Sequence, residues 1–145
     1  MTQPAILINL NRCTGCWTCA MACKVGHKLD QDVFWEYIRT NGGNDIDEPG
    51  GVWPNLYMSW TPVYTSKCNM CGDRTKNGDE PFCTYNCPTN ALNFGDTSDP
   101  QSTISLRIEE LKEKGFRIFQ PHPWEASHKG IYYAQKATRN NTSLE

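Results

Sequence analysis

The sequence predicts an α+β fold, in which two strand–loop–helix units carry two groups of cysteines. Eight cysteines fall into two groups of four, and a short apolar run of strand length lies beside each group. A length of 145 residues is typical of about one domain, so we expect residues 1–145 to form a single domain. Within it we expect a core at residues 1–96, an insertion at 24–67 and a C-terminal helix and strand extension at 97–145.

The core elements follow from local sequence. "AILINL", residues 5–10, is a strand-length run before the first cysteine group, too short for a membrane span. Residues 18–29 can be helical. Pro88 is suited to the first position of a short helix after the second group, and "ALNFG", residues 91–95, predicts a returning strand.

The insertion is rich in aromatic residues. We expect a strand at "VFWEYIRT", a loop at "NGGNDIDEPGG" and a second apolar stretch at "LYMSWTPVY". Four tryptophans lie at or before residue 60, and we expect them to form an apolar cover over the cysteine sites: Trp17, Trp35, Trp53 and Trp60. The alternative is that Trp17 contacts a redox partner.

The extension begins with a predicted helix after Asp99 or Ser102. Ile104, Ile108 and Leu111 share one face of this helix, Glu110 and Lys114 are spaced to pair, and Gly115 ends it. Short strands are expected at 116–119 and 130–135. The extension could brace the core or dock a larger subunit, and the sequence leaves both open.

Composition and the absence of certain motifs limit the classes of function that we expect. A net charge of −2 gives no basic field, so we expect no nucleic-acid partner. The N-terminal residues show no signal peptide, which predicts a cytoplasmic protein without membrane insertion, or export together with a signal-bearing partner. No nucleophile–base pair or phosphate loop is present, so we expect a non-catalytic chain.

The cysteine spacing indicates the cofactor. The first group is Cys-x2-Cys-x2-Cys-x3-Cys, and the second is Cys-x2-Cys-x11-Cys-x3-Cys followed by Pro88. Two tight groups without a secretion signal argue against disulfides. Zinc sites take ligands as separated pairs, which three successive thiols at x2 spacing do not fit, although two four-cysteine zinc sites remain the alternative. The spacing is that of bacterial two-cluster ferredoxins, in which the fourth thiol of each run binds the other cluster.

This pattern predicts two 4Fe–4S clusters with crossed ligands. Cluster one would be held by Cys13, Cys16, Cys19 and Cys87, and cluster two by Cys68, Cys71, Cys83 and Cys23. The histidines, His27, His122 and His128, show no ligand spacing and are expected to be ordinary surface or core residues.

Two stretches resemble a known family. "NRCTGCWTCAMACK" and "KCNMCGDRTKNGDEPFCTYNCPTNALNFGD" are similar to the first and last cysteine motifs of the iron–sulfur subunits of the dimethyl sulfoxide reductase family. The tail from "FGDTSDPQST" to "GIYYAQ" is also similar. Typical members carry four such motifs, and the two middle ones are missing here, with the join near "SWTPVYTSK".

The resemblance implies a function. It implies an electron-transfer subunit that relays single electrons through two 4Fe–4S clusters. The partners would be a molybdenum or tungsten bis-pterin catalytic subunit, placed nearer cluster one, and a soluble donor or acceptor. The alternative is a free-standing soluble ferredoxin with two 4Fe–4S clusters.

Overall fold

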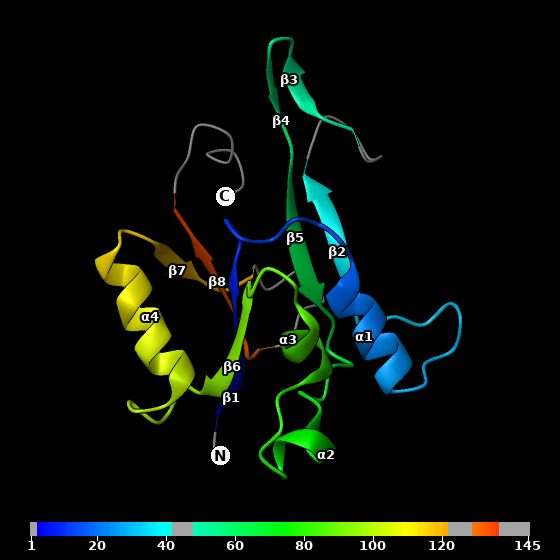
Figure 1. Ribbon diagram of the computed structural model, residues 1–145, viewed down its shortest axis with the longest axis vertical. Helices are drawn as coiled ribbons and strands as arrows, with labels where there is room; N and C mark the ends of the chain where they lie inside the picture. Colours follow the sequence, from blue (N-terminus) through cyan, green and yellow to red (C-terminus); the bar gives the residue numbers. More distant parts are fainter. Residues whose placement is uncertain (1–2, 42–47, 122–128, 137–145) are drawn as a thin grey trace.

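The computed structural model describes residues 3–41, 48–121 and 129–136 (Figure 1). Helices and strands are mixed along the chain, as expected for an α+β fold. In order they are β1 (Pro4–Asn9), α1 (Thr18–Gly26), β2 (Glu36–Asn41), β3 (Gly50–Val52), β4 (Asn55–Tyr57), β5 (Ser59–Tyr64), α2 (Gly72–Thr75), α3 (Phe82–Asn86), β6 (Leu92–Asp96), α4 (Thr103–Glu113), β7 (Arg117–Phe119) and β8 (Ile131–Gln135).

A four-stranded sheet with the order β6-β1-β8-β7 forms the centre of the fold. β1 pairs antiparallel with β6 and parallel with β8, and β7 pairs antiparallel with β8. Because successive side chains of a strand point to opposite faces, β1 supplies both sides of the sheet. Ala5 and Leu7 pack with Ile104 and Leu111 of α4, whereas Ile6 and Ile8 belong to the cluster of buried residues that contains Cys19 and Cys83.

The segment between the cysteine groups forms two small antiparallel ladders. β2 pairs with β5, and this ladder adds Ile38 and Tyr64 to the core on the cysteine side. The hydroxyl of Tyr133 on β8 donates a 2.6 Å hydrogen bond to the carbonyl of Pro62, which ties β5 to the central sheet. The β3–β4 hairpin projects at one end of the long axis, and α2 lies at the other end (Figure 1).

The extension after residue 96 is part of the central sheet. β8 lies between β1 and β7, and Ile131 on β8 is fully buried. Ser102 caps α4 by accepting a hydrogen bond from the Ser105 amide, as its position predicted. The extension therefore braces the core, which is one of the two roles that the sequence left open.

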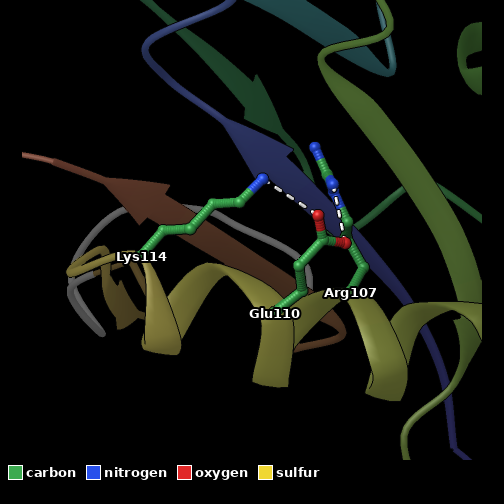
Figure 2. A network of polar contacts seen from close by, with 3 residues as sticks. All are labelled: Arg107, Glu110 and Lys114. Atoms are coloured by element: carbon green, nitrogen blue, oxygen red, sulfur yellow. Dashed lines mark hydrogen bonds and ion pairs between the residues drawn. The ribbon is translucent and has the colours of Figure 1, made fainter.

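The exposed face of α4 carries a network of charges (Figure 2). Glu110 pairs with Lys114 at 3.0 Å, as the spacing predicted, and with Arg107 at 2.9 Å. These two cations lower the pKa of the Glu110 carboxyl. Such exposed pairs contribute little to stability, so the helix is held mainly by its buried face.

Two local predictions about helices differ from the structure. The helix expected at 18–29 ends at Gly26, because Lys28 adopts a left-handed φ of 55°. The short helix expected to begin at Pro88 is wrong. Asn90 adopts a left-handed φ of 53°, and its amide donates a 3.3 Å hydrogen bond to the carbonyl of Cys87, so residues 88–89 form a single turn. The helix α3 comes before Cys87 instead.

Candidate metal centres

The structure brings the eight cysteines together on one side of the central sheet. All eight lie in described residues, and none of them forms a disulfide. Cys87 lies far along the chain from the first motif, yet four thiols line one cavity: Cys13, Cys16, Cys19 and Cys87. Ile38 of β2 and Pro62 of β5 complete the wall of this cavity on the side of the small ladder.

The first cysteine loop depends on a close approach between its backbone and an aromatic ring. Gly15 has a φ of 70°, and a Cβ atom there would lie 2.4 Å from the ring of Trp60. Glycine is therefore required on both conformational and steric grounds. Trp17 follows in the left-handed region, and α1 begins directly after it, so that Cys19 and Cys23 lie on the buried side of the helix.

The second set of thiols comes from three elements. Cys23 lies on α1, Cys83 lies on α3, and Cys68 and Cys71 belong to the loop before α2. Cys71 itself has a left-handed φ of 51°. α1 and α3 pack closely, because Gly26 has no side chain and the ring of Phe82 occupies that space.

Electrostatic effects show which thiols are neighbours. Burial, the carboxyl group of Glu36 and the nearby thiols of Cys71 and Cys68 together raise the pKa of Cys23 to about 12. Burial also raises the pKa of Cys13, with Cys87 and Cys16 adding to the effect.

Cys83 of the second set also lies near Cys19 of the first set. Burial dominates the raised pKa of both Cys83 and Cys19. Cys68 adds to the effect at Cys83, and Cys83 adds to the effect at Cys19.

Polar groups surround the sulfur atoms. Backbone amides donate to sulfur at both sets, from Met70 to Cys68 and from Ala91 to Cys87, each at 3.4 Å. The Thr18 hydroxyl lies 3.2 Å from Cys16 Sγ and lowers the pKa of that thiol. N–H and O–H groups around thiolates are typical of metal–thiolate centres, where they orient and tune the ligands.

A carboxyl group lies beside these thiols. Glu36 on β2 is 2% exposed, and its polar neighbours are the side chains of Tyr64 and Cys19, which oppose the effect of burial on its pKa. Burial raises its pKa to about 7. Glu36 in turn raises the pKa of Cys23, second only to burial. This residue could not be predicted from the sequence, because a single acidic residue in an aromatic strand carries no spacing signal.

His27 also lies against a cysteine, which the sequence did not predict. Its Nε2 atom is 3.1 Å from Cys71 Sγ. Desolvation lowers the pKa of His27, and the nearby Asp73 opposes this. The other two histidines, His122 and His128, lie outside the described residues.

The donor set fits iron–sulfur clusters. In the described part of the chain, no three histidine, cysteine or acidic side chains form a group that could hold one metal ion. A 4Fe–4S cluster takes one thiolate at each of four irons. The four thiols that line the cavity supply that number for one cluster.

The tryptophans do not gather into one cover. Trp60 packs against the buried core beside Gly15, and Trp35 stacks on His27 at 4.7 Å between ring centroids. Trp17 lines the cavity and is 37% exposed, whereas Trp53 on the hairpin is 80% exposed. The tryptophans therefore make separate contacts and do not form the single apolar cover that was expected over the cysteine sites.

No helix in the described segments is long and apolar enough to cross a membrane.

Two known protein families match the regions that carry these cysteines. Residues 6–26 match a 4Fe–4S binding domain, and residues 51–97 match a 4Fe–4S dicluster domain. The two matches contain all eight cysteines, so both cysteine regions are similar to 4Fe–4S binding domains.

Three curated proteins are similar to this chain in sequence. The sequence is 24% identical to a putative dimethyl sulfoxide reductase iron–sulfur subunit of Halobacterium salinarum over 200 residues, which covers 79% of this chain and 76% of that protein. It is 36% identical to a component of the anaerobic dimethyl sulfoxide reductase of Escherichia coli over 92 residues, covering 63% of this chain and 40% of the relative. It is 49% identical to the formate dehydrogenase beta subunit of Megalodesulfovibrio gigas over 47 residues, covering 32% and 22%.

The aligned regions differ in length from this chain and from its relatives. The chain spans only 40% of the Escherichia coli relative. The alignment with the Halobacterium protein is longer than this chain itself, so that protein has residues within the aligned region without a counterpart here. This agrees with the two middle motifs being missing. The chain is therefore related to the iron–sulfur subunits of the dimethyl sulfoxide reductase family of molybdopterin oxidoreductases.

Proposed function

We propose that this chain relays single electrons through two 4Fe–4S clusters, as a non-catalytic subunit of an oxidoreductase complex. Its partners would be a molybdenum or tungsten bis-pterin catalytic subunit and an external soluble donor or acceptor. The observation that carries the proposal is the meeting of Cys87 with Cys13, Cys16 and Cys19 around one cavity, in a chain related to such subunits. When bound, a 4Fe–4S cluster accepts and releases one electron at a time.

We assign the ligands as the spacing predicts. Cluster one would be held by Cys13, Cys16, Cys19 and Cys87, and cluster two by Cys23, Cys68, Cys71 and Cys83. The shared cavity supports the first set, and the effects of Cys71 and Cys68 on the pKa of Cys23 support the second. Residues 1–145 would act as one domain, which the position of β8 beside β1 supports.

The catalytic subunit would cover the surface around residues 14–18. Cys16 is exposed there, and Trp17 is partly exposed beside the cavity. Trp17, Met21 and Val25 are spaced four residues apart, and each exposes a large apolar side chain. Exposed aromatic side chains of this kind are common at the centres of interfaces.

The aromatic insertion would add to the contact with a partner. Val52, Trp53 and Leu56 are exposed around the turn of the β3–β4 hairpin. A free ferredoxin has no need of this exposed apolar surface, which favours the subunit over the free-standing carrier.

Anaerobic purification of the tagged protein under native conditions tests the proposal. We expect an equimolar large subunit that contains molybdenum or tungsten and a pterin. A protein that purifies as a monomer, and that exchanges electrons equally well with unrelated carriers, would instead establish the free ferredoxin.

A further inference from the structure

His27 connects the two cysteine motifs. It is the C-cap residue of α1, and its backbone amide donates a 3.0 Å hydrogen bond to the carbonyl of Cys23. Its side chain reaches the second motif, where Nε2 lies 3.1 Å from Cys71 Sγ. One residue therefore touches two of the four cysteines assigned to cluster two, one through its backbone and the other through its ring.

The ring of His27 is held in place by aromatic neighbours. Trp35 lies against it with ring centroids 4.7 Å apart, and Phe82 meets it edge-on at 5.4 Å. These neighbours are fixed in turn. The carbonyl of Trp35 accepts hydrogen bonds from the amide and hydroxyl of Thr65, and the guanidinium of Arg74 lies over the ring of Phe82. A side chain confined in this way keeps its nitrogen directed at the sulfur.

The direction of the hydrogen bond follows from the chemistry of the sulfur. A cysteine that binds iron does so as a thiolate, which carries no hydrogen and can only accept. Imidazole can present an N–H at Nε2, so His27 must be the donor when Cys71 holds iron.

We propose that His27 is a positioning residue that raises the reduction potential of cluster two relative to a site without this donor. The proposal rests on the proposed function, because it requires Cys71 to be a cluster ligand. A hydrogen bond to a ligand sulfur stabilises negative charge on the centre, and the reduced cluster carries one more negative charge than the oxidised one. The bond therefore favours reduction, in line with the known dependence of cluster potential on hydrogen bonds to sulfur.

Cluster one lacks a comparable contact among the described residues, where His27 is the only histidine. Its sulfurs are approached by threonine hydroxyls and a backbone amide instead. The effect of His27 should thus be confined to one of the two clusters, which provides an internal control within the same molecule.

The substitution His27→Phe removes the donor and keeps an aromatic ring between Trp35 and Phe82. We expect iron and sulfide contents equal to those of the wild type, a lower potential for cluster two and an unchanged potential for cluster one. Redox titration followed by paramagnetic resonance measures both potentials. The matched variant His27→Gln retains an N–H at the same distance along the side chain, and we expect it to return the cluster-two potential toward the wild-type value.

The outcomes separate this inference from the proposed function. If His27→Phe keeps both clusters and both potentials, the inference is overturned and the proposed function stands. If the wild-type protein holds no iron, both are overturned.

A measurement on the wild type remains decisive even if His27→Phe fails to retain cluster two. Labelling the histidines with ¹⁵N should then reveal a histidine nitrogen coupled to the cluster-two signal. Absence of that coupling would overturn the inference.

Discussion

The two sets of thiols differ in their exposure to solvent. Among Cys13, Cys16, Cys19 and Cys87, only Cys19 is buried, and Cys16 is exposed. Among Cys23, Cys68, Cys71 and Cys83, three are buried, and only Cys68 is of intermediate exposure. The first set lines a cavity together with Trp17, whereas the second comes from the packed helices α1 and α3 and from the loop before α2.

This difference indicates a division of roles within one small protein. A centre near the surface gives a partner a short electron path, and the protein can tune a buried centre through its own side chains. Trp17 lies beside the first set, and His27 contacts the second.

The largest effect should follow removal of the iron. Eight thiols without metal would leave much of the core on the cysteine side unsupported, because metal binding and folding are coupled in small metal domains. Under an anaerobic chelator we expect loss of native circular dichroism, with the resonance signal of the more exposed cluster one decaying before that of cluster two. Reconstitution with iron and sulfide is the control. Equal decay rates would contradict the contrast in exposure.

Loss of a single cluster should follow substitution of a crossed ligand. Cys87→Ser should damage the cluster of the first motif, and Cys23→Ser should damage the cluster of the second. Paramagnetic resonance of each reduced variant shows which signal is lost. Each variant serves as the control for the other, and loss of the cluster of its own sequence motif in each would refute the crossing.

A moderate effect is expected on the face of the sheet away from the thiols. Ile104 on α4 is fully buried, so Ile104→Ala should lower the free energy of unfolding by about 2–5 kcal/mol. The cluster potentials should stay unchanged. Leu106 on the same helix is 54% exposed, and Leu106→Ala should change stability by less than about 0.5 kcal/mol. A shift in potential in the Ile104 variant would mean that the two faces are coupled.

The most selective effect should come from the exposed edge of the cavity. Trp17→Ala should leave the iron content unchanged and slow electron exchange with the catalytic subunit, measured by stopped-flow absorption. Leu106→Ala is the matched control, because this exposed apolar side chain lies on α4, which packs on the face of the sheet away from the thiols. Equal slowing in both variants would argue against docking at the cluster-one surface.

Much of the fold could be predicted because it depends on local signals. The strand at residues 5–10, the returning strand at 91–95 and the capped helix after Ser102 are confirmed as β1, β6 and α4 within one or two residues. The short helix at Pro88 was wrong because Asn90 adopts a left-handed φ of 53°, which ends the turn two residues later and leads directly into β6.

The environment of the thiols could be predicted only in part. Cysteine spacing indicates which thiols meet, since it reflects the chemistry of one cofactor. The positions of Glu36 and His27 depend instead on how the β2–β5 ladder and the Cys71 turn pack against α1, and no spacing in the sequence reports that packing. Residues that surround the sulfurs are therefore visible only in the three-dimensional structure.

Metal analysis of the anaerobically purified protein tests the central claim most directly. Two complete sets of four thiols predict close to eight irons and eight acid-labile sulfides per chain. The 4Fe–4S centres should also give the protein a broad absorption band at roughly 400 nm. Zinc in place of iron, or about four irons per chain, would contradict the division of the thiols into two clusters.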